Sequence, residues 1–357
     1  MKRREFMACT AGLMGSVLPV IGRAEDKPCP PDRLQAVGGT SISTTCSAAP
    51  LGDTYLAQQA STMSAGDWKQ ITTGGLSTAL FDTGANNTLG YMDKGAYDPI
   101  NKRIRFIGNG HLEQLRWHQY DETANTWSNL APPSWYGGGA VYEHGYQHNT
   151  VDPATGDFFY RNFNSSSIRR FVHASGTWVT ISSSNDNIAG GIEWLPSLGT
   201  QGGLVQYLAP YIRTWDKATN AVTLRSSSSG ASTYHCCAVR NFANNTIYVG
   251  GGNGSSSVWS VNGAGTVGSL PSCPISFGIG STVTTACPVS GDLIVIRNNS
   301  SAYGLSGASW GALSMTGAPG FGTVQAGSHI VAVPIPAYGV ILFLFGNTPA
   351  TWLYKHA

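Results

Sequence analysis

The chain is poor in charged residues. Only 11% of its 357 residues are Asp, Glu, Lys or Arg, and the formal net charge is +2. Four of the cations, Lys2, Arg3, Arg4 and Arg23, lie near the N-terminus. Binding to nucleic acid requires a concentrated basic surface, and the rest of the sequence supplies none. The scarcity of Asp and Glu also disfavours a hydrolase that works through a pair of carboxylates.

Long uncharged apolar runs are also absent beyond the first residues. Residues 1–24 combine the paired arginines with an apolar stretch from Ala8 to Ile21 and a small-residue end at Gly22-Arg23-Ala24. This layout predicts a bacterial export signal, and Arg3-Arg4-Glu5-Phe6 resembles a twin-arginine signal, with an ordinary secretory signal as the alternative. The stretch is shorter than the roughly 20 residues of a membrane-spanning helix. We therefore expect a periplasmic or secreted protein that is free of the membrane once the signal is removed.

Cysteine is sparse, and no pair has the C-x-x-C spacing typical of zinc ligands. Cys9 lies in the expected signal, and the remaining cysteines are Cys29, Cys46, Cys236, Cys237, Cys273 and Cys287. In an oxidising compartment the short separations predict the disulfides Cys29–Cys46 and Cys273–Cys287. The adjacent Cys236 and Cys237 form either a vicinal disulfide or two free thiols.

Glycine and short β-forming runs are abundant. The chain has 45 glycines, and its clearest unit is residues 143–162. There a run carrying His144, Tyr146 and His148 leads through the turn sequence Asp-Pro-Ala-Thr-Gly-Asp into a second apolar run. Turn residues between two such runs predict a hairpin. The spacing of two places the three side chains on one face of a strand.

Similar units recur along the chain. Their second strands end near residues 108, 161, 208, 250, 297 and 346, which are 42 to 53 residues apart. All-β units of this length predict a β-propeller. We expect one all-β domain of six four-stranded antiparallel blades. Seven blades are the alternative, if residues 72–92 contain a degenerate one.

The two ends of the chain are predicted to meet. The last unit ends with its third strand at Thr351–Lys355, whereas Trp68–Ile71 resembles the outer strand of later units. This N-terminal strand can complete the last blade, which closes the ring and removes exposed strand edges. The expected organisation is therefore an export signal at 1–24, an extended arm at 25–65 and the propeller at 66–357.

The unit from Tyr97 to Leu130 resembles a kelch repeat. It has a strand ending in glycine, then Trp117 and, after a turn, Trp127 at the start of the outer strand. The paired glycines of such repeats are well kept only at Gly250-Gly251-Gly252. Kelch-type propellers include oxidases, lyases, isomerases and binding proteins, so the fold does not decide the function.

Function is expected at the face where the connections between blades converge. In a propeller this face is shared by the connections from each outer strand to the next inner strand and by those between second and third strands. The residues predicted there are rich in His, Tyr and Arg. The candidate catalytic residues are His148, Tyr234, His235 and Arg161. The candidate substrate-binding residues are His144, Tyr146, Trp194, Tyr207, Arg240, Arg297 and His329.

These residue types suit β-elimination from a polysaccharide that contains uronic acid. A His removes the C5 proton, a Tyr protonates the leaving oxygen, and an Arg neutralises the carboxylate. We prefer His148 to His235 as the base, because it shares a strand face with His144 and Tyr146. In fold, export and residue types the chain resembles propeller-type polysaccharide lyases such as ulvan lyases. No family motif matches residue by residue.

The expected partner is an anionic polysaccharide, and the protein is expected to be a monomer. No cofactor is expected, and a structural metal ion is the alternative. A non-catalytic propeller that binds glycan or protein is the main alternative. A copper enzyme resembling galactose oxidase is less favoured, because its ligand motifs are not recognisable. A sialidase is disfavoured by the absence of repeated Ser-x-Asp-x-Gly-x-x-Trp boxes.

Overall fold

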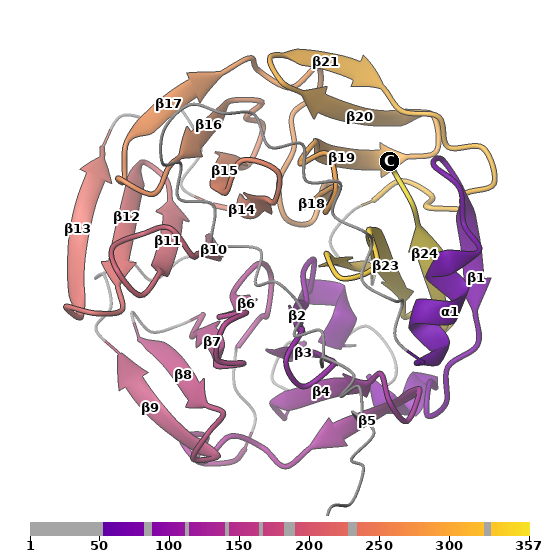
Figure 1. The fold of residues 1–357 in the computed structure, drawn as a ribbon, viewed down its shortest axis with the longest axis horizontal. Helices are drawn as coiled ribbons and strands as arrows, with labels where there is room; N and C mark the ends of the chain where they lie inside the picture. Colours follow the sequence, from indigo (N-terminus) through magenta and orange to yellow (C-terminus); the bar gives the residue numbers. More distant parts are fainter. Residues whose placement is uncertain are drawn as a thin grey trace, which may run out of the picture. The chain divides into compact units, whose positions relative to one another are not determined.

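The β-forming runs build a ring of six blades (Figure 1). The computed structural model describes residues 53–81, 88–110, 114–139, 143–163, 167–181, 190–227, 234–324 and 330–357. Their strands form six four-stranded antiparallel sheets, each ordered along the chain from the inner to the outer strand except where β1 completes the last. The predicted fold class and blade number are confirmed.

The first three blades follow one another along the chain. The first contains β2 (Ala96–Asp98), β3 (Arg103–Gly108), β4 (Arg116–Asp121) and β5 (Thr126–Leu130). The second contains β6 (Asn149–Val151), β7 (Phe158–Arg161), β8 (Ile168–Val172) and β9 (Thr177–Ile181). The third contains β10 (Gly191–Leu195), β11 (Gly203–Leu208), β12 (Tyr211–Asp216) and β13 (Ala221–Ser226).

The remaining blades complete the ring. The fourth contains β14 (Cys236–Asn241), β15 (Thr246–Gly251), β16 (Val258–Val261) and β17 (Val267–Leu270). The fifth contains β18 (Val283–Ala286), β19 (Leu293–Asn298), β20 (Ser301–Ser306) and β21 (Ser309–Ala312). The sixth contains β22 (Ile330–Ile335), β23 (Val340–Phe345), β24 (Ala350–Tyr354) and the N-terminal β1 (Trp68–Ile71). The short helices are α1 (Tyr55–Ser61), η1 (Thr78–Leu80) and η2 (Thr88–Tyr91).

The ring closes as the sequence predicts. Strand β1 pairs antiparallel with β24, with Trp68 opposite Tyr354 and Ile71 opposite Thr351. The rings of Trp68 and Tyr354 also stack, with centroids 4.3 Å apart. Because β1 supplies the outer strand of the last blade, the first and last segments of the propeller hold each other in place.

A helix replaces part of the expected N-terminal arm. Residues 55–61 form α1, whose N-cap Thr54 accepts a hydrogen bond from the backbone N–H of Ala57 through its hydroxyl. Leu56 and Ala60 are buried in the same core cluster as strands of the first and last blades. The expectation of an extended arm was therefore wrong for this segment, because its apolar spacing spans only two turns and is too short to stand out. Residues 1–52, which include the expected signal, lie outside the described residues.

The adjacent cysteines of β14 are free thiols. Neighbouring residues of a strand point to opposite faces, so Cys236 packs with Tyr207 on one side and Cys237 with Tyr146 on the other. Burial raises the pKa of both thiols, that of Cys236 to about 11. Both are therefore core residues and poor nucleophiles at neutral pH.

The predicted disulfide between Cys273 and Cys287 is wrong, since both are free and buried. Strand β18 lies between them in the chain and takes them to opposite ends of the blade. The sulfur of Cys287 accepts hydrogen bonds of 3.4 Å from the N–H groups of Val289 and Ser290. It thus caps the turn after its inner strand in the way that Asp98 caps the equivalent turn of the first blade. The predicted pair Cys29–Cys46 lies outside the described residues.

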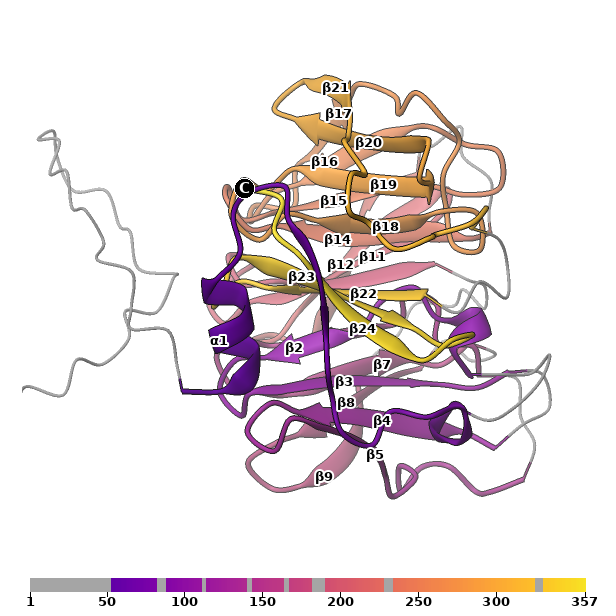
Figure 2. The same ribbon diagram turned by 90° about the vertical axis from the view of Figure 1, so that its right-hand side faces the viewer.

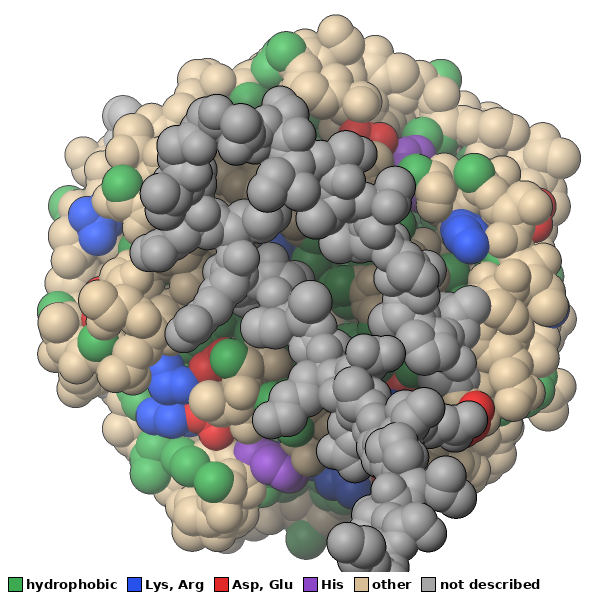
Figure 3. All heavy atoms as spheres, viewed as in Figure 1, with side chains coloured by type: hydrophobic (Ala, Val, Ile, Leu, Met, Phe, Trp, Pro, Cys, Tyr) green, Lys and Arg blue, Asp and Glu red, His purple; other side chains and the backbone are tan. Residues whose placement is uncertain are grey.

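Ion pairs join the second blade to the third, between the β6–β7 turn and the β12–β13 turn. Figure 3 views the face of the ring that carries α1, and it shows acidic and basic side chains gathered at the lower left. Lys217 Nζ lies 2.5 Å from Asp152 Oδ2 and 3.6 Å from Asp157 Oδ2. Burial would raise the pKa of Asp157, but the N–H of His173 and the cations Arg170 and Lys217 lower it overall. Asp157 therefore stabilises the fold at neutral pH and loses this contribution as the pH falls through its lowered pKa, below about 4.

Replacing Lys217 with Met should destabilise the propeller by about 3 kcal/mol, because it leaves two buried carboxylates without their shared cation. Chemical denaturation at neutral pH measures the loss, and the difference from wild type should shrink as the pH approaches 4. Arg225→Met is the control, since Arg225 is an exposed cation of β13 and should change stability by less than about 0.5 kcal/mol. Equal losses of stability in the two variants would contradict a stabilising role for the ion pairs of Lys217.

Candidate functional site

The site lies at the end of the ring where the blades are connected to one another. Figure 2 shows the ring from its side, with α1 at the left and this end, here called the site face, at the right. Figures 1 and 3 view the opposite face. The site face receives the segment before β6, the segment before β14 and the ends of β7 and β15.

Aromatic rings from two of these segments meet around Tyr146. Its ring centroid lies 5.2 Å from that of His144, 5.8 Å from that of His148 and 5.4 Å from that of His235. The ring of Tyr234 lies 6.5 Å away, and a hydrogen bond between the two tyrosines contributes, after burial, to the raised pKa of Tyr146. The structure therefore brings together all the predicted His and Tyr residues of these two segments.

Two of these residues have an unusual backbone. Tyr146 has φ of 34° and His235 has φ of 66°, in the left-handed region that side chains rarely adopt. The other described non-glycine residues with positive φ lie at hairpin turns and are Lys102, Asn125, Asn220 and Asn245. Tyr146 lies in a turn closed by the 2.8 Å hydrogen bond from the N–H of His148 to the carbonyl of Gly145. Non-glycine residues in such sparsely populated conformations cluster at functional sites. Here they are a Tyr and a His whose rings are in contact.

The backbone of Tyr146 is held from both sides. Its N–H donates to the carbonyl of Tyr91 at 2.6 Å, and its carbonyl accepts from the N–H of Asp93 at 3.2 Å. Gly145 lets these segments approach, because a Cβ at this position would lie only 1.7 Å from the sulfur of Met92. The segment from the end of η2 to the start of β2 thus fixes Tyr146 in its strained conformation.

His235 is the most exposed histidine of the cluster, since His144 and His148 are buried. It is half-buried, and its Nδ1 lies 2.8 Å from Asn253 Oδ1. An amide oxygen can only accept, so the ring proton is on Nδ1 and Nε2 is left as a proton acceptor. Burial lowers the pKa of His235, against the opposing effect of Asn253. At neutral pH the ring is therefore uncharged and oriented as a general base requires.

His148 lies in a layer beneath. It is 0% exposed, and its Nε2 lies 3.3 Å from both Arg161 Nη1 and the backbone nitrogen of Gly190. Both partners are donors, so Nε2 accepts and the ring is neutral. Burial, followed by the charge of Arg161, lowers the pKa of His148 well below its usual value. Arg161 itself is 1% exposed, so this pair forms part of the floor of the site.

Long side chains cross the central channel below that floor. Lys94 Nζ donates to the carbonyls of Ile192 at 2.5 Å and Ala238 at 3.2 Å, and pairs with Glu193 at 3.0 Å. Gln147 accepts from the N–H of Ala238 at 2.8 Å and donates to the carbonyl of Thr284 at 3.3 Å. These bonds join inner strands of blades across the axis.

The other predicted site residues have different surroundings. Trp194 and Tyr207 are buried between blades. Arg240 lies at the far end of β14, where it contacts Asn245 and Phe242. Arg297 is near the site face but donates to the carbonyl of Ser276 at 2.7 Å. His329 lies outside the described residues.

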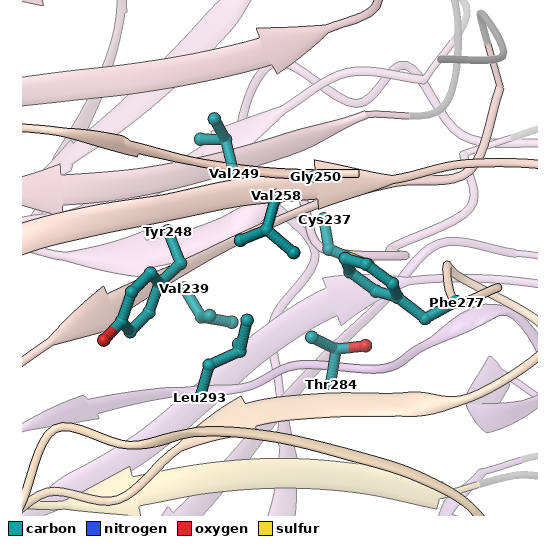
Figure 4. A pocket seen from close by; sticks show the side chains of 9 residues that line it. All are labelled: Cys237, Val239, Tyr248, Val249, Gly250, Val258, Phe277, Thr284 and Leu293. Carbon is teal, nitrogen blue, oxygen red and sulfur yellow. The ribbon is translucent and has the colours of Figure 1, made fainter. Parts of the chain in front are cut away.

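A seam between the fourth and fifth blades continues down from the site. Figure 4 shows the side chains that meet there, among them Cys237, Phe277 and Thr284. Cys237 belongs to the same core cluster as Tyr146, and Thr284 hydrogen-bonds to it. The rest of the lining is apolar apart from the hydroxyl of Tyr248, which accepts a hydrogen bond from the side-chain amide of Asn241. The seam therefore supports Tyr146 from below and presents no group for chemistry.

Sequence reasoning missed Asn253, Tyr91 and Phe163. Tyr91 stacks on His144 with centroids 4.0 Å apart, and Phe163 contacts Tyr146 at 5.5 Å. A signal was available for Asn253, because an Asn follows the second strand of several repeats, as at Asn109 and Asn162. That recurrence marks the site face. Tyr91 and Phe163 belong to no repeated pattern.

The fold defines the protein as a six-bladed β-propeller, and His and Tyr side chains cluster on one of its faces. No protein-family model matches the chain, and no curated protein matches it in sequence. Within the described part of the chain, no group of three or more His, Cys, Asp or Glu side chains is arranged to hold a metal ion. In the same residues, no helix has the length and hydrophobicity to cross a membrane.

Replacing Gly145 with Ala should displace Met92 and the strained Tyr146, because the added methyl overlaps the Met92 sulfur. Overpacking of this kind costs about 1–3 kcal/mol. Gly311→Ala is the matched control, since a Cβ at Gly311 meets nothing within 4 Å. Thermal unfolding and the near-ultraviolet circular dichroism of the aromatic cluster measure the two variants. A Gly145 variant as stable as the control would show that Met92 and Tyr146 are not packed tightly around Gly145.

Proposed function

We propose that the protein is a polysaccharide lyase that cleaves a uronic-acid-containing polysaccharide by β-elimination. The observation that carries the proposal is the array Asn253–His235–Tyr234, which places an oriented, uncharged His against the ring of a Tyr at a partly exposed surface. The rings of Tyr234 and His235 lie 4.1 Å apart. A base and an acid on the same side of a bound chain suit a syn elimination.

The proposed reaction assigns one step to each group. Nε2 of His235 takes the proton from C5, and the electron pair of that bond forms the double bond between C4 and C5. The bond from C4 to the glycosidic oxygen breaks, and this oxygen takes a proton from the Tyr234 hydroxyl. Tyr146 keeps its own proton because burial raises its pKa, so it can donate a hydrogen bond to Tyr234 and stabilise the resulting phenolate.

The buried cation beneath the site supports the same chemistry. Removing the C5 proton places negative charge on the adjoining carboxylate, and a fixed positive charge stabilises that state most strongly where water is excluded. Arg161 lies directly beside His148 in the floor. We assign Arg161 an electrostatic role and His148 the role of holding it. His235, which is accessible, takes the place of His148 as the preferred base.

A binding function without catalysis is the second candidate. Tyr91, Phe163 and Tyr234 are each partly exposed around the buried Tyr146, and such rings can stack on the faces of sugar units. This surface suits glycan binding whether or not a bond is cleaved. The expected anionic polysaccharide, the monomeric state without a cofactor, and export through residues 1–24 all remain predictions from the sequence.

Incubation with ulvan, alginate, glucuronan or pectin should raise the ultraviolet absorbance of conjugated unsaturated uronates for at least one of them. His235→Ala should lower the rate by about 10²–10⁴-fold, as expected for loss of a general base. With wild type, kcat/KM should rise with pH through a value below 6.5, since the pKa of His235 is lowered. His173→Ala, in a turn on the opposite face, is the control.

Each alternative has its own result in this experiment. Binding of a polysaccharide without any absorbance change would favour the non-catalytic function. Full activity in His235→Ala combined with its loss in His148→Ala would restore His148 as the base. Because His148 is buried, that variant is compared with wild type by thermal unfolding as well.

A further inference from the structure

A partly buried carboxylate next to the site has no role in the steps above. Glu143 lies in the segment that leads into β6. Its Oε2 accepts the backbone N–H of Phe163 at 2.8 Å and the hydroxyl of Tyr160 at 3.0 Å, and its Oε1 accepts the side-chain amide of Asn162 at 3.0 Å. All three donors belong to the end of β7 and the connection that follows it.

The main chain of Glu143 is fixed to the first blade. Its N–H donates to Asn109 Oδ1 at 2.9 Å, and its carbonyl accepts the N–H of Asn109 at 3.1 Å. The carbonyl of Asn109 is also 3.2 Å from Nδ1 of His144. The side chain of Glu143 therefore binds the second blade, while its backbone is joined to Asn109 of the first blade and also to the hydroxyl of Tyr160.

The orientation of the Asn162 amide is set by a further contact. Arg169 Nε donates to Asn162 Oδ1 at 2.9 Å, so the amide nitrogen of Asn162 must face Glu143. With donors on both of its oxygens, the Glu143 site is built for a carboxylate. A Gln amide of the same size would place N–H groups against the N–H or O–H groups that now donate.

Glu143 connects the segment that carries Tyr146 and His148 to the segment that carries Arg161. In the chain it directly precedes His144, and Tyr146 and His148 follow it closely. Its donors Asn162 and Phe163 directly follow Arg161. We propose that Glu143 is a positioning residue that sets the placement of Tyr146 and Arg161 relative to each other, an inference that rests on the proposed function of the site.

Glu143→Gln should lower kcat of the elimination by about 10²-fold, the size of effect that a misplacement near 1 Å has on a reacting site. KM should stay within about threefold, because the Glu143 carboxylate is bound by Tyr160, Asn162 and Phe163 of the second blade, whereas Tyr234 and His235 precede the fourth blade. Tyr160→Phe removes a single donor without changing the shape of the ring, and should lower kcat by less than tenfold.

The chain offers a matched control in Glu122. Its carboxylate is 0% exposed and accepts hydroxyls from Thr54, Tyr97 and Tyr338. This site lies at the opposite face, near α1. Glu122→Gln should reduce thermal stability and leave kcat within about twofold of wild type. An equal loss of kcat in the two Gln variants, or wild-type kcat in Glu143→Gln, would overturn the positioning role.

A second readout separates this inference from the proposed function. The ring nitrogens of His144 and His235 give nuclear magnetic resonance signals that need no turnover. Glu143→Gln should shift the His144 signal, whereas Glu122→Gln should leave it unchanged. If wild type cleaves no uronate polymer, the proposed function fails while this shift still supports the positioning role. An unshifted His144 signal would reject the positioning role even in an active enzyme.

Discussion

The hydrogen bonds that Lys94 and Gln147 make across the axis are the constraint on which the site depends. Burying an ammonium group is costly, and Lys94 offsets the cost through two carbonyls and Glu193 on the far side of the channel. These contacts hold inner strands of separate blades close together. They fill the central channel, so His148 and Arg161 above them can form the floor of the site.

The site is built in two layers that differ in access to solvent. The lower layer contains His148 and Arg161, which are almost fully buried and contact each other. The upper layer contains Tyr234 and His235, with Asn253 orienting the imidazole. Tyr146 lies between the layers and contacts both. Burial keeps a fixed positive charge below a neutral base, which is the arrangement that removal of a proton beside a carboxylate requires.

Low charge content is also visible in how the protein stabilises the buried Glu122 and the partly buried Glu143. Glu122 is held by hydroxyl groups, and Glu143 by a hydroxyl, an amide and a backbone N–H. A carboxylate that accepts two or three such hydrogen bonds can be buried without a cation in direct contact. The two carboxylates join different parts of the ring, one beside α1 and one next to the proposed active site.

The sequence by itself determined the all-β propeller and the closure by Trp68–Ile71, and it favoured six blades over seven, because these follow from local strand and turn chemistry repeated at a regular interval. It also placed His144, Tyr146, His148, Tyr234 and His235 on one face, since strand direction is set by the repeat. Helix α1 was missed because two turns give too weak a pattern.

Only the tertiary structure decided which of these residues substrate could reach. The burial of His148, the place of Arg240 at the far end of β14 and the separation of Cys273 from Cys287 depend on packing between blades. That packing brings together residues distant in the chain, such as Asn253 with the ring around Tyr146. A repeat pattern fixes the direction of each strand, but it contains no information on how deep a side chain lies or which neighbouring blade it contacts.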